Sequence, residues 1–305
     1  MSVSAPALQT KSASTPERIL LRLDWQVIRR LDGLLQGDYR TLFYGEGIDF
    51  SDLREYQAQD DIRHIDWNVT ARMNSLYVRQ YIEDREITTW FLLDLSPSMG
   101  FGPLGRPKET VLIDYVTTLA RLLTRNGNRV GAILYNNRIV GTIPPRGGRN
   151  QVLRLTRDLL RKTKAPIKTT TDLSVLLNAG LNTLKRRSLV FVISDFISKP
   201  GWQASLSLLN QRHELIAVRM WDPREVELPD AGLIVVEDSE TGEQLYVDTA
   251  NPEFRRRFFE NAERRERTLR ENCQRAGVDL YSLSTEEDLV SAIIRMAALR
   301  KKRRR

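Results

Sequence analysis

Three oxygen-bearing side chains alternate along Asp94-Leu95-Ser96-Pro97-Ser98, directly after the apolar run Trp90 to Leu93. The spacing i, i+2 and i+4 lets one carboxylate and two hydroxyls converge on one point where a buried strand ends. A hard cation such as Mg²⁺ prefers six oxygen ligands at about 2.1 Å and usually keeps several waters. The segment therefore indicates a divalent metal site, although each residue alone also suits an ordinary turn.

Two further loops offer oxygen ligands to the same site. Thr169-Thr170-Thr171-Asp172 opens a predicted helix, and Ser194-Asp195-Phe196 follows a second apolar run. Taken singly, a threonine there also suits a helix cap and an aspartate an ordinary loop. Together they predict one Mg²⁺ or Mn²⁺ ion held by Asp94, Ser96, Ser98, Thr171 and Asp195, with Thr170 as the alternative to Thr171. Neutral hydroxyls leave such an ion electrophilic, so the site would accept an acidic residue of a client protein.

The elements that must position these loops alternate between strands and helices from residue 87 onward. Strands are predicted over 87–95, 130–135, 139–143, 189–193, 215–220 and 279–283, and helices over 109–123, 150–162, 172–184, 253–274 and 286–299. This alternation predicts an α/β fold with a doubly wound, mainly parallel sheet and helices on both faces. Ligands gather at the carboxyl ends of the strands in such sheets, where the candidate residues lie.

Besides these elements, the sequence predicts three smaller units. An amphipathic helix covers 17–36, with Leu20, Leu23, Val27, Leu31 and Leu34 on one face. A polar, loop-rich stretch follows over 37–74, then a strand over 76–81. A short hairpin pairs 233–236 with 244–247.

The order of the site residues resembles the metal-ion-dependent adhesion site of von Willebrand factor A domains, D-x-S-x-S followed by T and then D. Asp94, Ser96 and Ser98 match the first part, Thr171 the second and Asp195 the third. The resemblance implies that the serines and threonine contact the metal directly, whereas the aspartates bind mostly through water or support the serines. It implies a von Willebrand factor A-like domain over 85–299.

The preceding segment is similar to the bacterial domain of unknown function 58 family. The matching motifs are Gly47 to Phe50, Leu53 to Tyr56, Asp60 to Arg63, Ile65 to Trp67 and Ala71-Arg72. The resemblance implies a family-specific region over 17–84 and a partnership with a MoxR-type AAA+ ATPase, in which the protein acts as an adaptor or chaperone. The residues themselves allow two roles for Arg54 to Arg72: a charge-paired brace anchored by Tyr56 and Trp67, or a docking face.

Charge and composition narrow the remaining functions. The net charge is +8, of which the segment 300–305 supplies six positive charges. This segment is expected to be a solvated basic tail, and the alternative function is a regulator that binds nucleic acid or an anionic membrane surface through it. A leader over 1–16 is expected to be disordered. The single cysteine, Cys273, and the lack of about 20 consecutive apolar residues favour a cytoplasmic protein without a transmembrane segment.

Enzymatic readings find little support. Gly100-Phe101-Gly102-Pro103-Leu104-Gly105 matches a dinucleotide-binding pattern, but no carboxylate follows the next strand, and Arg106-Pro107 replaces the Lys-Ser/Thr of a phosphate-binding loop. One cysteine and two separated histidines make zinc improbable. We therefore expect a binding protein rather than an enzyme.

Overall fold

The computed structural model describes residues 15–34, 53–57, 62, 65–73, 75–79, 87–161, 170–238 and 241–303. Its centre is a six-stranded sheet in the order β10-β7-β6-β3-β4-β5. The strands are β3 (Thr88–Asp94), β4 (Arg129–Tyr135), β5 (Ile139–Arg146), β6 (Leu189–Ser194), β7 (Glu214–Trp221) and β10 (Asp279–Ser284). All neighbouring pairs are parallel except β4 and β5. The order is that of a doubly wound sheet, so the predicted fold class is confirmed.

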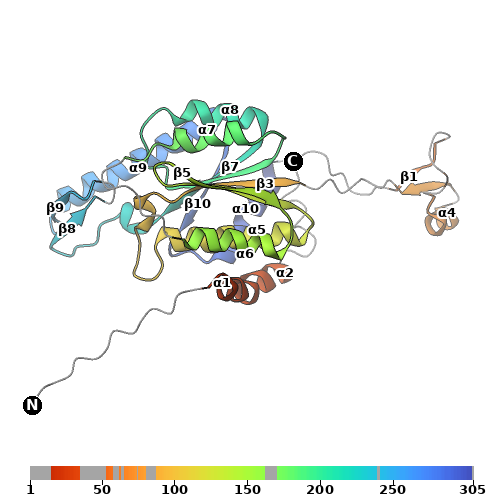
Figure 1. The fold of residues 1–305 in the computed structure, drawn as a ribbon, viewed down its shortest axis with the longest axis horizontal. Coiled ribbons are helices and arrows are strands. Elements are labelled where there is room, and N and C mark those ends of the chain that lie inside the picture. Colours follow the sequence, from red (N-terminus) through yellow and green to blue (C-terminus); the bar gives the residue numbers. More distant parts are fainter. Residues whose placement is uncertain are drawn as a thin grey trace, which may run out of the picture.

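Helices cover both faces of the sheet (Figure 1). They are α5 (Lys108–Arg125), α6 (Arg149–Leu160), α7 (Leu173–Thr183), α8 (Trp202–Arg212), α9 (Pro252–Arg275) and α10 (Leu289–Arg303). One apolar core joins the sheet to α5, α6 and α10, and the other joins it to α7, α8 and α9. The central strands are buried on both sides, which explains why they are continuous apolar runs rather than alternating ones.

Helix α8 was not predicted from the sequence. Its buried residues Trp202, Leu206 and Leu209 are spaced at i, i+4 and i+7, as on the apolar face of a helix. The serines between them hide this pattern, and no capping side chain marks the start of the helix. The loop-rich prediction over 37–74 likewise missed the short helix α4 (Trp67–Met73).

The N-terminal helix packs on α5 and α6 in three parts: α1 (Pro16–Leu23), a π-helical turn η1 (Asp24–Ile28) and α2 (Arg29–Leu34). Thr15 caps its start, and Leu20 is fully buried. In the π turn, the Arg29 N–H donates to the carbonyl of Asp24. This bond inserts one extra residue and shifts the apolar face by one position. Leu31, after the π turn, is still fully buried, whereas Leu34 at the end of α2 is 65% exposed, so its predicted place on the buried face was wrong.

The edge strand β5 pairs antiparallel with β4 and ends in Pro144-Pro145-Arg146. Its ladder is irregular between Val130 and Ala132, where the two prolines lie opposite and supply no N–H. Gly131 permits the close approach, because a Cβ there would lie 2.8 Å from the carbonyl oxygen of Ile143.

The expected solvated tail is partly helical. Helix α10 continues to Arg303, and Arg300 is 3% exposed and forms an ion pair with Glu214. Burial of its guanidinium against a carboxylate on β7 makes Arg300 part of the domain. Residues 304 and 305 lie outside the described residues. Among the helices that the structure describes, none is long and apolar enough to cross a lipid bilayer.

Two small sheets stand apart from the central one. Strands β1 (Leu53–Glu55) and β2 (Tyr77–Arg79) pair antiparallel beside α4, and β8 (Leu233–Glu237) and β9 (Gln244–Asp248) form the predicted hairpin. Trp67, expected as an anchor, is 65% exposed. Asp60, Asp61 and Arg63 lie outside the described residues, so brace and docking face both stay open.

Candidate functional site

The candidate ligands lie at the carboxyl edge of the two central strands. Asp94 ends β3, and Asp195 follows Ser194 at the end of β6. The two strands are parallel neighbours in a register that pairs Leu93 with Ile193, so their ends meet at one edge. Ser98 lies in the short 3-10 turn η3 (Pro97–Gly100), which begins directly after Ser96.

Asp94 is fully buried, and both of its carboxylate oxygens accept hydrogen bonds. The backbone N–H of Ser96 donates to Oδ1 at 2.9 Å, and the hydroxyl of Ser194 donates to Oδ2 at 2.6 Å. Burial, together with repulsion from the Asp195 carboxylate, raises the pKa of Asp94 to about 6, although the bonds from Ser194 and Ser96 oppose this rise. The positive charge near Asp94 is therefore too small to offset the cost of burying its ionised carboxylate.

The two serine hydroxyls lie side by side. The Oγ atoms of Ser96 and Ser98 are 3.1 Å apart, and both residues are buried. Adjacent oxygens in an octahedron with 2.1 Å bonds are separated by about 3.0 Å. Because this spacing fits neighbouring positions around Mg²⁺, the hydroxyl pair suits a hard cation. Within the described residues, no three His, Cys, Asp or Glu side chains gather in a metal-binding arrangement, so this candidate depends on its hydroxyls.

Asp195 is held by a buried lysine that sequence reasoning missed. The Nζ of Lys108 lies 2.8 Å from Asp195 Oδ2 and 2.6 Å from Glu225 Oε1, and Lys108 is fully buried. Burial lowers the pKa of Lys108, but the carboxylates of Asp195 and Glu225 raise it by more, so the net direction is upward. Lys108 is therefore charged and links the first turn of α5 to the ends of β6 and β7.

Lys108 left one weak signal in the sequence. It follows Pro107 at the first position of α5, where the helix dipole disfavours a cation. A lysine at such a position suggests a nearby carboxylate that stabilises it. Its partners lie 87 and 117 positions away in the chain, so the sequence alone did not identify them.

Thr171 lies in the loop before α7 and is buried, whereas the alternative, Thr170, is exposed. The carbonyl of Thr171 accepts hydrogen bonds from the Lys199 N–H at 3.0 Å and from the Ser198 hydroxyl at 3.3 Å. These bonds join its loop to the segment after Asp195. Burial thus favours Thr171 over Thr170 as the inward-facing residue, and Thr169 lies outside the described residues.

The segment after Asp195 holds a strained conformation. Phe196 has φ = 59°, in the left-handed region that bulky residues rarely adopt. Its N–H donates to the Ser194 hydroxyl at 2.8 Å, and the next N–H, of Ile197, donates to Asp195 Oδ1 at 3.0 Å. The Phe196 ring packs on Trp202 with centroids 5.6 Å apart. Ser194 thus connects the strained backbone to Asp94, a role that sequence reasoning did not assign to it.

These features define an α/β domain with a buried cluster of carboxylates and hydroxyls at the carboxyl edge of its sheet. The chain belongs to the family described as protein of unknown function DUF58, whose model matches residues 52–268. Uncharacterised proteins from Mycobacterium bovis and Mycobacterium tuberculosis strain H37Rv are each 34% identical to it over 285 residues, which cover 93% of this chain and 89% of theirs.

Solved structures resemble the chain at lower similarity. The conserved hypothetical protein BatB from Bacteroides thetaiotaomicron is 13% identical, with a TM-score of 0.45, and the match covers 71% of this chain and 99% of that one. The manganese-loaded TRAP protein of Plasmodium vivax is 21% identical, with a TM-score of 0.33 over 44% of this chain and 57% of that one.

Proposed function

We propose that this chain is a metal-dependent protein-binding adaptor. Ser96 and Ser98 would contact one Mg²⁺ or Mn²⁺ ion directly, and Asp94, Thr171 and Asp195 would complete or support its oxygen ligands. A divalent ion held there would offer a Lewis-acidic position to a carboxylate from outside. The partner group in this proposal is an acidic residue of a client protein.

The observation that carries the proposal is a pair of serine hydroxyls beside buried carboxylates whose negative charge is only partly neutralised. The Ser96 and Ser98 oxygens are 3.1 Å apart, and Asp94 is buried with a raised pKa. Lys108 bonds to Asp195 and Glu225, and Asp94 is close enough to Asp195 for the two carboxylates to repel each other, so the four groups carry a formal charge of −2 when all are ionised. A divalent cation would neutralise this charge, whereas a monovalent one would leave half of it.

We propose binding rather than catalysis because, among the described residues, the carboxylates beside the serines are already engaged by other groups. His213, a histidine that the structure describes, precedes β7 and so lies at the opposite, amino edge of the sheet. Asp195 is engaged by Lys108, and Asp94 accepts hydrogen bonds on both oxygens. The resemblance to the family supports a MoxR-type AAA+ ATPase as the working partner in client assembly or maturation.

Metal binding is tested by calorimetry with Mg²⁺ and Mn²⁺ on the wild type, Ser96→Ala and Ser98→Ala. The matched control is Ser188→Ala, since Ser188 is equally buried but precedes β6 at the opposite edge of the sheet. We expect each site variant to bind the ion at least about tenfold more weakly, the equivalent of about 1.4 kcal/mol for one lost ligand, and the control to match the wild type. Equal affinity in all four proteins would rule out the hydroxyl pair as the metal site.

Partner binding is tested separately by capture of a MoxR-type ATPase with the wild type and Asp94→Ala, each with Mg²⁺ and with EDTA. If EDTA and the folded Asp94→Ala variant both abolish capture, the bound metal is the group that contacts the partner. If neither changes capture, the partner is recognised by the Arg54 to Arg72 region instead. The alternative of a regulator that binds through its basic tail loses support, because Arg300 is buried against Glu214.

A further inference from the structure

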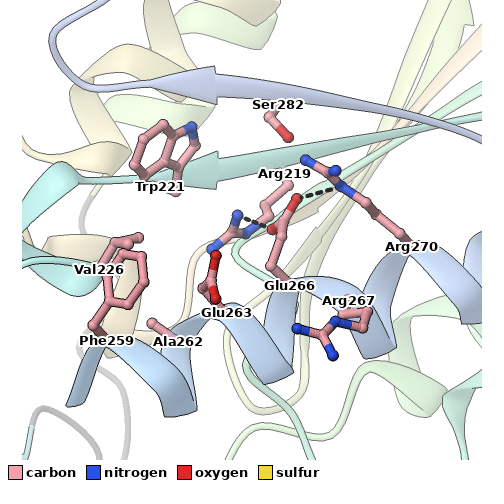
Figure 2. Close-up of a pocket in the computed structure, with 10 residues that line it drawn as sticks. All are labelled: Arg219, Trp221, Val226, Phe259, Ala262, Glu263, Glu266, Arg267, Arg270 and Ser282. Carbon is pink, nitrogen blue, oxygen red and sulfur yellow. Dashed lines mark hydrogen bonds and ion pairs between the residues drawn. The ribbon is translucent and has the colours of Figure 1, made fainter. Parts of the chain in front are cut away.

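A pocket of about 380 Å³ lies between α9 and the ends of β7 and β10 (Figure 2), and neither Ser96 nor Ser98 lines it. Five of its lining residues are charged: Arg219, Glu263, Glu266, Arg267 and Arg270. Its apolar lining is Trp221, Val226, Phe259 and Ala262, and Ser282 completes it. The volume is that of a small-ligand site, large enough for one or two amino-acid side chains.

The charged end of the pocket has an excess of guanidinium groups. Glu266 bonds to both Arg219 and Arg270, with Arg270 Nε at 2.9 Å from its Oε1. The Arg267 side chain forms no hydrogen bond or ion pair with any other residue that the structure describes, and Glu263 is exposed. Three arginines against two glutamates leave a net charge of +1. The pocket therefore favours an anionic group.

The apolar end lies beside this charge rather than apart from it. The Arg219 guanidinium is 5.8 Å from the centre of the Trp221 ring, and Figure 2 shows Phe259 and Val226 next to Trp221. Arg219 is paired with Ser282 across the β7–β10 ladder, so its backbone is fixed by the sheet. A ligand that fills the pocket must therefore combine an apolar group with an acid within a few ångströms.

We propose that this pocket binds an acidic residue and a neighbouring apolar side chain of a partner polypeptide. The proposal extends the protein-binding function argued above to a second contact that does not require metal. The carboxylate would lie against Arg267 and Arg270, and the apolar side chain against Trp221 and Phe259.

The surface beyond the pocket suits a polypeptide better than a small molecule. The hairpin β8–β9 lies beyond the amino-terminal end of α9 (Figure 1), and Arg255 of α9 bonds to Asp230 at 3.3 Å and to the carbonyl of Thr249 at its base. Leu233, Leu245 and Tyr246 are 65–78% exposed on this hairpin. As a two-stranded sheet, it also has one unpaired edge on each strand within the described chain, and an extended peptide can pair with such an edge.

The test uses a fluorescein-labelled peptide, Gly-Ser-Phe-Glu-Gly-Ser, amidated at its C-terminus, and a matched peptide with Gln in place of Glu. Binding is followed by fluorescence anisotropy in excess EDTA, so that failure of the metal site does not affect the result. The double variant Arg267→Gln/Arg270→Gln is compared with Arg264→Gln/Arg265→Gln, which removes two exposed charges of the same helix outside the pocket. We expect the Glu peptide to bind at least about tenfold more tightly than the Gln peptide, and the pocket variant alone to lose this preference.

Three results would overturn the proposal. They are equal binding of the two peptides, equal loss in the pocket and control variants, and no binding at millimolar peptide. Competition with free 3-phenylpropionate tests whether the pocket recognises a carboxylate next to an apolar group in a small molecule or only in a polypeptide. If this small acid displaces the peptide at equal concentration, the site recognises small carboxylates and the assignment to a polypeptide is wrong.

Discussion

The Nζ atom of Lys108 lies 2.8 Å from Oδ2 of Asp195, and both side chains are buried at the edge of the sheet where the candidate metal ligands lie. A built-in cation thus neutralises one of the two site aspartates. The other, Asp94, has no such partner among its hydrogen bonds, which come from a backbone N–H and a hydroxyl. This asymmetry assigns different expected effects to substitutions around the site.

Lys108→Met is expected to destabilise the metal-free protein by about 3 to 5 kcal/mol, because it leaves the carboxylates of Asp195 and Glu225 without their buried partner. Urea denaturation in EDTA measures the change. Lys199→Met is the control, since Lys199 follows β6, as Asp195 does, but its side chain is exposed. Removing the ammonium should also tighten Mg²⁺ binding, because a positive charge no longer opposes the ion. An unchanged free energy of unfolding would contradict the assigned ion pair.

The metal-free protein is expected to lose stability between about pH 4 and pH 6.5 through Asp94. Its pKa rises from 3.8 to about 6 on folding, so the folded state binds the proton more tightly than the unfolded state. The contribution is full below pH 4 and lost as the pH rises through 6, by about 3 kcal/mol.

Asp94→Asn removes this titration. At pH 8 in EDTA, the variant avoids the cost of about 3 kcal/mol for the buried charge but loses about 1 kcal/mol of hydrogen bonding. We therefore expect it to be more stable than the wild type by about 2 kcal/mol. At pH 4 the wild type should be the more stable of the two. Thermal unfolding at both pH values gives the comparison, and a difference that does not change with pH would be the contrary result.

Phe196→Gly should be more stable than Phe196→Ala by about 1 kcal/mol. Both variants lose the ring that packs on Trp202, but only glycine adopts φ = 59° without strain. Denaturant unfolding of the two proteins isolates the backbone contribution. If alanine proves equal or better, the left-handed conformation at this position is absent in solution.

Leu20→Ala tests the packing of the N-terminal helix. Leu20 is fully buried against the α5–α6 face, whereas its neighbour Leu21 is 58% exposed. The expected loss is about 2 to 5 kcal/mol for Leu20→Ala and within about 0.5 kcal/mol for Leu21→Ala. Equal effects of the two substitutions would mean that the helix does not dock through this face.

The hydrophobic pattern carried most of the fold, because the central strands are continuous apolar runs and most helices have a clear apolar face. The π turn at Asp24–Ile28 was not predictable in this way, since the bond from Arg29 to Asp24 leaves no mark in the spacing of the leucines before it. Arg300 was misjudged for a related reason. Six basic residues in a row predict a solvated segment, and only the tertiary structure brings Glu214 to the first of them.

The site residues likewise fall into those that are close together in the sequence and those that only the tertiary structure brings together. Asp94, Ser96 and Ser98 belong to one short segment, so their spacing alone brings them together. Lys108 and Glu225 act through contacts between residues 87 and 117 positions apart, which no local pattern encodes. Ser194 was visible in the sequence beside Asp195, but its bond to Asp94 depends on the parallel register of β3 and β6.

The prolines of β5 have a consequence for self-association. An edge strand presents a row of unpaired N–H and C=O groups, and a strand of another molecule can pair with them and extend the sheet. Pro144 and Pro145 remove two consecutive donors, and the irregular ladder beside them bends the strand. This side of the sheet is a poor template for fibrils, and copies of the protein crowded at high concentration should not extend one another's sheets from β5.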